Sequence, residues 1–96
     1  MTPVPALVTW AGRLPAGLKY STLAKFAEDK NWPDRGWSVV LEFDRPPAEL
    51  GSPSPGVVRF LMEDAPHDRL RPGCKFELFA GSAKVADVEI LAAGEE

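Results

Sequence analysis

The sequence predicts a small all-β domain, and three observations lead to this prediction. Several short segments alternate apolar and polar residues, which is the pattern of half-buried strands. Ten prolines and eight glycines divide the 96 residues into pieces too short for long helices. The segment 73–91 reads as a hairpin around a tight turn. Short strands that each have one apolar face pack most economically as a barrel or a sandwich.

The first expected strand covers residues 4–10, in which Ala6, Val8 and Trp10 share one side. Prolines at positions 3 and 5 keep the chain extended but cannot donate ladder hydrogen bonds. We therefore expect this strand at a sheet edge or at the mouth of a barrel.

Residues 11–36 are expected to form a long irregular loop, because glycines and prolines interrupt its first half. Within it the sequence allows a short helix over residues 21–31, capped by Ser21 or Thr22 and ended before Trp32-Pro33. The apolar residues that would share one face of this helix are Leu23, Phe26 and Ala27.

The middle of the chain predicts two strands separated by a loop. The first covers residues 37–43 and has the clearest alternation in the sequence. Residues 44–55 contain four prolines and are expected to be an exposed loop without helix or strand. The second strand is expected over residues 56–62. The residues expected to face inward from the two strands are Trp37, Val39, Leu41, Phe43, Val58, Phe60 and Met62.

The hairpin near the end of the chain supplies the fourth and fifth expected strands, residues 74–80 and 83–91. Gly81-Ser82 is expected to form a two-residue turn, with the glycine at positive φ. Asp87 and Glu89 fall on the outer face. The inward residues of the hairpin are expected to be Cys74, Phe76, Leu78, Ala80, Ala86, Val88 and Ile90.

Length and composition restrict the class of protein. Residues 1–96 are expected to form a single domain with one modest core. The net charge of −3 argues against a general nucleic-acid binder, which normally has a basic face. No apolar run approaches the roughly 20 residues that span a bilayer, and the first ten residues do not resemble a signal peptide. With only one cysteine the sequence favours a reducing cytoplasm.

Residues capable of catalysis or metal binding are few, so we expect no catalytic site, no metal site and no cofactor. The sequence has no glycine-rich phosphate loop. Cys74 is expected to be a packed core thiol, and the single histidine, His67, a solvated loop residue. A less favoured alternative is an enzyme that uses His67 with Asp64 and Asp68 in a cleft.

The segment 11–36 is the most basic part of the chain, with five basic against three acidic side chains. This excess is either chance or a surface that faces an acidic partner. Trp32 lies among these charges, where it would either act as a binding hot spot or cap one end of the core. The candidate binding residues are Arg13, Lys19, Tyr20, Lys25, Lys30, Trp32 and Arg35.

The terminal hairpin resembles the end of the third domain of elongation factor Tu. In that family a glycine precedes a Phe-x-(Leu/Ile) strand, and a second glycine and a short turn lead to a Val-rich return strand. The residues that match this pattern in order and spacing are Phe76, Leu78, Gly81 and Val85. Upstream, Gly12-Arg13 is similar to the family's Gly-Gly-Arg loop after its first strand, and Pro66 stands near the position of the family's proline before the hairpin.

The resemblance implies a six-stranded antiparallel barrel of the elongation factor Tu C-terminal type. In the family this domain has no catalytic residue and contacts a nucleotide domain, transfer RNA and an exchange factor. The sequence lacks the family's basic RNA surface, and Ala83 stands where the family has an arginine after the turn. We therefore expect a non-catalytic protein-interaction module whose partner is another protein. The alternative is a translation-related RNA-binding module that uses the basic residues of 11–36.

Overall fold

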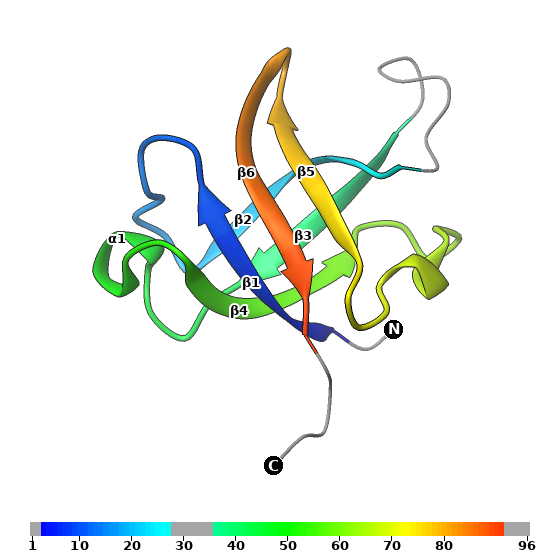
Figure 1. Ribbon diagram of the computed structural model, residues 1–96, viewed down its shortest axis with the longest axis horizontal. Coiled ribbons are helices and arrows are strands. Elements are labelled where there is room, and N and C mark those ends of the chain that lie inside the picture. Colours follow the sequence, from blue (N-terminus) through cyan, green and yellow to red (C-terminus); the bar gives the residue numbers. More distant parts are fainter. Residues whose placement is uncertain (1–2, 28–35, 92–96) are drawn as a thin grey trace.

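The computed structural model describes residues 3–27 and 36–91, and these form a closed barrel of six antiparallel strands (Figure 1). Around the barrel the order is β1-β4-β3-β2-β5-β6, and β6 pairs with β1 to close it. The strands are β1 (Val4–Trp10), β2 (Lys19–Lys25), β3 (Trp37–Glu42), β4 (Ser54–Phe60), β5 (Lys75–Ala80) and β6 (Ala83–Ile90). The prediction of a small all-β barrel with six antiparallel strands is confirmed.

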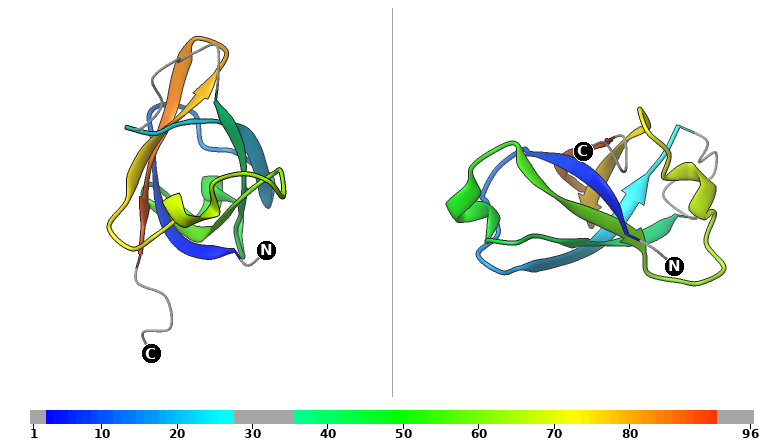
Figure 2. Two further views of the ribbon diagram at one scale, coloured as in Figure 1. Left: turned by 90° about the vertical axis from the view of Figure 1, so that its right-hand side faces the viewer. Right: turned by 90° about the horizontal axis from the view of Figure 1, so that it is seen from below.

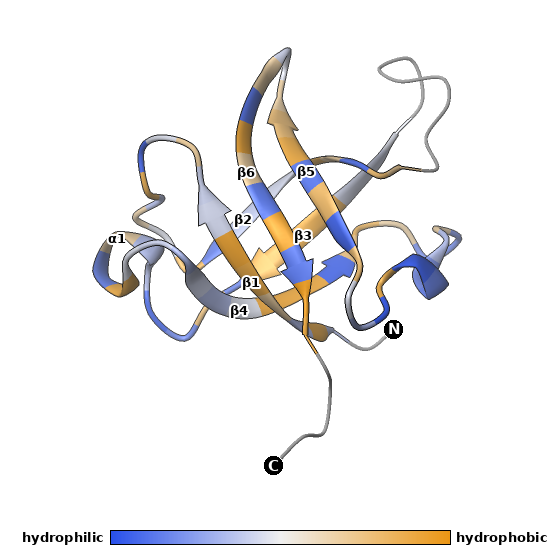
Figure 3. Cartoon of the chain, viewed as in Figure 1, coloured by the Kyte–Doolittle hydropathy of each residue, from blue (hydrophilic) through white to orange (hydrophobic). Residues whose placement is uncertain are grey.

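Apolar side chains from all six strands fill the interior of the barrel. Every second residue is buried along much of β1, β5 and β6, and Figure 3 shows the resulting alternation of hydropathy along β5 and β6. Because the predicted strands had the correct phase, most of the predicted inward residues are indeed buried. The largest fully buried apolar side chains in the strands are Phe60, Leu41, Leu78, Ile90, Val8, Val39, Val58 and Val88.

Aromatic rings close the two ends of the barrel. Figure 2 shows the ribbon of the barrel from two further directions. At one end, here called the Trp10 end, the ring of Trp10 lies 5.3 Å from that of Tyr20 and 6.2 Å from that of Phe43. At the other, the Phe26 end, the ring of Phe26 lies 4.4 Å from Phe76 and 5.7 Å from Phe60. Contacts of this kind add to the free energy gained by burying the rings.

The first strand was expected at a sheet edge or at the mouth of a barrel, and of these two positions the sheet edge is wrong. β1 has neighbours on both sides, because Ala6 pairs with Gly56 of β4 and with Ile90 of β6. Pro5 lacks an amide, but its carbonyl accepts a hydrogen bond from Leu91, so the proline does not prevent pairing.

The short helix allowed over residues 21–31 is also wrong for the part that is described. Residues Lys19–Lys25 form β2, and residues 28–35 lie outside the described residues. In β2 the side chains of Tyr20, Thr22 and Ala24 alternate inward, opposite Leu41, Val39 and Trp37 of β3. Leu23, placed on the apolar helix face, points outward. Pairing with β3 therefore overrides a helical spacing that rested on only three residues.

Three smaller expectations in the middle of the chain are corrected. Residues 44–55 contain the single-turn helix α1 (Pro47–Leu50), which starts at prolines that a helix tolerates in its first turn. β4 begins inside the same segment at Ser54, which is fully buried. β4 ends at Phe60, so Met62 lies beyond the strand and is 53% exposed rather than inward.

The hairpin of β5 and β6 forms as predicted, with Ala80 paired with Ala83 across a two-residue turn. Gly81 has φ of +64°, a conformation that residues with a Cβ adopt at a cost. The register shifts between Leu78 and Phe79, which marks a β-bulge. A bulge bends the strand that carries it, and the tip of the hairpin extends away from the barrel (Figure 1).

Candidate functional site

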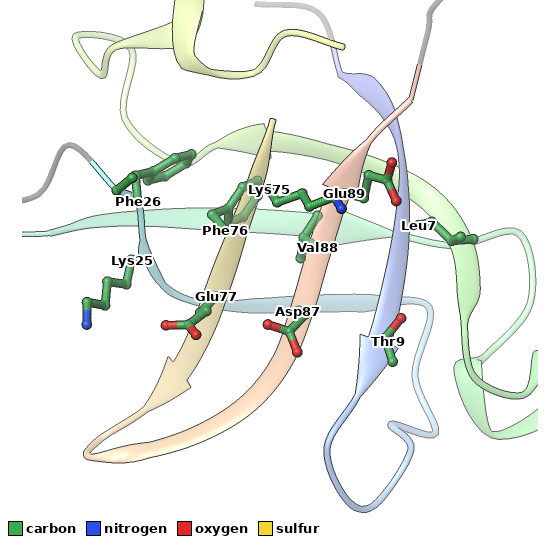
Figure 4. A pocket seen from close by; sticks show the side chains of 11 residues that line it. Leu7, Thr9, Lys25, Phe26, Lys75, Phe76, Glu77, Asp87, Val88 and Glu89 are labelled. Atoms are coloured by element: carbon green, nitrogen blue, oxygen red, sulfur yellow. The ribbon is translucent and has the colours of Figure 1, made fainter. Parts of the chain in front are cut away.

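Two hollows in the described surface lie toward opposite ends of β2. One opens at the Trp10 end and has a volume of about 440 Å³. We call it the mouth hollow. The other crosses the outer surface of β1, β6 and β5 to the end of β2, with a volume of about 500 Å³. We call it the outer groove (Figure 4).

The mouth hollow is built from residues 10–20 near the start of the chain and from β6, which is distant from them in sequence. Its lining consists of Trp10 with the following loop 11–16, Tyr20 at the start of β2, and Lys84 and Val85 in β6. The amide of Ala11 donates a hydrogen bond of 2.9 Å to the carbonyl of Val85, which ties the loop to β6. The hollow therefore exists because β6 closes the barrel against β1.

Hydrogen bonds hold the indole of Trp10 in place at the base of the mouth hollow. Its Nε1 donates to Oγ of Ser54 at 3.1 Å, and the Ser54 hydroxyl donates in turn to the carbonyl of Gly51. The backbone amide of Trp10 donates to Oγ of Ser52 at 3.0 Å. The ring of Tyr20 meets the indole edge-on, with an interplanar angle of 87°. Both rings thus have defined contacts within the barrel.

The described residues that line the mouth hollow include two cations, Arg13 and Lys84, and no carboxylate. Nζ of Lys84 lies 2.9 Å from Oδ1 of Asp87 and 3.2 Å from Oε2 of Glu77, outside the lining. The hydrogen bond to Asp87, and then that to Glu77, raises the pKa of Lys84 above its ordinary value of 10.5. The ammonium therefore stays protonated, and its charge is shared with these two carboxylates.

The outer groove carries charges of both signs. Lys25 and Lys75 line it together with the carboxylates of Glu77, Asp87 and Glu89 (Figure 4). Asp87 stands opposite Glu77 in the pairing of β5 with β6, so the two carboxylates would repel each other. The ammonium of Lys84 contacts both carboxylates and offsets this repulsion. The mixed charge gives the groove no clear preference for a cationic or an anionic ligand.

The structure gathers only part of the predicted binding residues. Arg13 and Tyr20 meet at the mouth hollow. Lys19 lies on the outer surface, 3.6 Å from the carboxylate of Glu42. Lys25 is at the far end of β2, in the outer groove. The remaining three, Lys30, Trp32 and Arg35, lie outside the described residues.

Sequence reasoning missed the contribution of Lys84 and Val85 to the mouth hollow. Both residues were placed correctly in the return strand of the hairpin. What the alternation pattern does not contain is the pairing of β6 with β1, which brings Val85 next to Ala11. Lys84 also carries a charge on an exposed strand position, which by itself is typical of a solvated surface.

The expectations for Cys74 and His67 need correction. Cys74 is half-buried, just before β5, rather than fully packed in the core. His67 is half-buried at the start of a 3₁₀ turn (His67–Arg69) and is not a fully solvated loop residue. Its Nε2 lies 2.7 Å from the carbonyl of Glu63, and its ring meets that of Phe60 edge-on. These contacts fix the ring against the Phe26 end of the barrel.

Within residues 3–27 and 36–91, no group of three or more His, Cys, Asp or Glu side chains is placed to hold a metal ion. The same residues contain no helix with the length and apolar character needed to cross a membrane. Comparison of the chain with protein-family models, with curated proteins and with solved structures gives no match.

Proposed function

We propose that this chain is a non-catalytic protein-interaction module with an elongation-factor-Tu-like barrel, and that its mouth hollow binds an acidic segment of another protein. The observation that carries the proposal is the lining of this hollow. It combines two cationic side chains with apolar groups and contains no carboxylate. A segment with both acidic and apolar side chains is complementary to such a surface.

The apolar part of the lining supplies the contact area for binding. Leu14, Pro15 and Val85 are half-buried and present carbon atoms to the hollow. Tyr20 and Trp10 are fixed by their mutual packing and by the hydrogen bonds of Trp10. Rigid aromatic side chains of this kind lose little conformational entropy on binding, which favours them as anchors of interfaces.

The cationic part supplies selectivity for acidic partners. Arg13 is exposed on the loop 11–16 and carries the planar guanidinium that binds carboxylates in a bidentate manner. Lys84 contributes less to this selectivity, because its ammonium is already shared with Asp87 and Glu77.

The alternative function, a translation-related RNA-binding module, would use the same cationic and aromatic side chains of the mouth hollow. Two cations beside an aromatic ring also suit single-stranded RNA. However, RNA affinity depends on several neutralised phosphates, whereas the described residues of the lining include two cations, Arg13 and Lys84. The protein partner is therefore the favoured proposal, and RNA is tested as the other outcome.

The test captures partners on the immobilised full chain from a cytoplasmic extract of the source organism, with and without nuclease. Wild type is compared with Arg13→Glu and with Arg71→Glu, an exposed arginine at the Phe26 end. We expect a protein that survives nuclease treatment, is lost with Arg13→Glu and is kept by Arg71→Glu. Equal capture by both variants would rule out the mouth hollow, and loss of every bound protein on nuclease treatment would favour RNA.

A further inference from the structure

The seam between β2 and β5 is the shortest in the barrel. Only Leu23, Ala24 and Lys25 of β2 have partners in β5, which are Phe79, Leu78 and Glu77. The other five seams contain four to six pairs each. On its other side, β2 pairs with β3 from Lys19 to Ala24. In the first half of β2, the backbone edge that faces β5 is therefore unpaired, while the opposite edge pairs with β3.

A β-bulge in the hairpin lies at the end of this seam. Leu78 pairs with Ala86 and Phe79 with Lys84, so Val85 of β6 is the extra residue, and Phe79 forms the last pair with β2. Beyond Phe79 the bent hairpin leaves the path along β2. The carbonyl of Phe79 instead accepts a hydrogen bond from the side-chain hydroxyl of Thr22. A side chain thus ends the ladder, and the backbone edge from Lys19 to Ser21 stays open.

The open edge coincides with the mouth hollow. Tyr20 belongs both to the unpaired part of β2 and to the lining of the hollow, and Lys84 and Val85 line it from β6. An exposed strand edge beside a hollow with side-chain pockets is the arrangement that proteins use to bind extended peptides by strand addition.

We infer that the acidic partner segment binds in an extended conformation, as an added β-strand along Lys19–Ser21 of β2. This inference rests on the proposed function and specifies its mode of recognition. Backbone hydrogen bonds to the open edge would hold the segment, while its alternate side chains enter the mouth hollow. Acidic side chains of the segment would approach Arg13, and apolar ones would contact Tyr20 and Val85.

The test uses a synthetic peptide, acetyl-Asp-Val-Glu-Val-Asp-Val-amide, titrated into the ¹⁵N-labelled full chain and followed by NMR. The control is the same peptide with N-methyl groups on alternate residues, which removes hydrogen-bond donors from one edge and keeps every side chain. Amide hydrogen exchange of residues 19–22 is measured with and without each peptide. A third titration uses Arg13→Glu, which changes the side-chain contact and leaves the backbone edge intact.

We expect the unmethylated peptide to slow exchange of the β2 amides that face β5, while the amides bonded to β3 are protected from the start. Methylation should weaken binding by about tenfold or more, since each lost hydrogen bond contributes about 1 kcal/mol. Arg13→Glu should weaken it as well. Strand addition is overturned by equal affinity of both peptides, or by no binding up to about 1 mM peptide. If both peptides bind equally and Arg13→Glu still weakens binding, the mouth hollow is a binding site but strand addition is wrong. The proposed function itself is contradicted only by the outcomes of the capture experiment.

Discussion

The rings of Phe26 and Phe76 stack with centroids 4.4 Å apart, just past the last pair between β2 and β5. Backbone pairing at this seam ends at Lys25 and Glu77, so the two rings take over where the ladder stops. Phe26 is 1% exposed and Phe76 4% exposed. The Phe26 end of the barrel therefore depends on side-chain packing for its closure.

Phe76→Ala should lower the free energy of unfolding by about 3–5 kcal/mol, because it removes a buried ring and leaves a cavity beside Phe26. Leu61→Ala is a suitable control, since Leu61 is 49% exposed and its truncation leaves no cavity in the core. Urea denaturation of both variants and wild type measures the difference. A loss below about 1 kcal/mol for Phe76→Ala would show that the inward face of β5 is assigned incorrectly.

Gly56→Ala should destabilise the barrel because β4 passes very close to β3 at this residue. A Cβ placed on Gly56 would lie 2.6 Å from the carbonyl oxygen of Glu42 and 2.6 Å from the ring of Phe43. We expect a loss of about 1–3 kcal/mol or more from the forced displacement. Gly12→Ala is the matched control, since a Cβ there meets no atom within 4 Å and Gly12 has no positive φ. Equal thermal unfolding temperatures of the two variants would contradict the close approach.

The ion pairs of Lys84 should make stability depend on alkaline pH. The pKa of Lys84 is raised in the folded protein, first by Asp87 and then by Glu77, so the folded state holds the proton more tightly than the unfolded one. The contribution is fully present below the ordinary pKa of 10.5 and is lost as the pH rises through the folded pKa. The stability difference between wild type and Lys84→Met should therefore be constant from about pH 7 to 9 and shrink above pH 10.5. A difference that grows with alkaline pH would contradict the raised pKa.

Tyr20 is the expected aromatic anchor for the partner captured in the proposed experiment, because it lines the mouth hollow, whereas Trp32 stays a prediction from the sequence outside the described residues. Tyr20→Ala should weaken binding of that protein by about 2 kcal/mol, which is about thirtyfold, because an aromatic anchor dominates such interfaces. Lys25→Ala, a charge at the other end of β2, should mainly alter the association rate. Calorimetry and stopped-flow kinetics measure the two effects. If RNA were the ligand, log K would fall with log salt at about −0.7 per phosphate contact, and each lysine removed would reduce this slope.

The sequence was most informative where alternation and turn chemistry agree. The hairpin of β5 and β6 satisfies both, because its apolar residues alternate and Gly81 supplies the positive φ of the turn. β3 was equally clear. β2 was not clear from the sequence, because its Lys-Tyr-Ser-Thr stretch alternates only weakly between apolar and polar residues. It is identified as a strand by its pairing with Leu41 and the neighbouring residues of β3.

The candidate site was harder to predict than the fold, for a physical reason. The mouth hollow depends on which strands become neighbours when the barrel closes, and a single sequence does not contain that information. Arg13 and Tyr20 were found because they carry charge or an aromatic ring in a basic segment. Lys84 and Val85 reach them only through the pairing of β6 with β1.

The short seam between β2 and β5 also bears on how the chain folds. It joins residues that are more than fifty positions apart, whereas the hairpin of β5 and β6 joins near neighbours in sequence. Closing so long a loop costs entropy, and only three pairs and one ring stack compensate for it there. We therefore expect the hairpin to form early and the β2–β5 seam to close last. In the native ensemble, transient opening should start at this seam, with the rest of the barrel still intact.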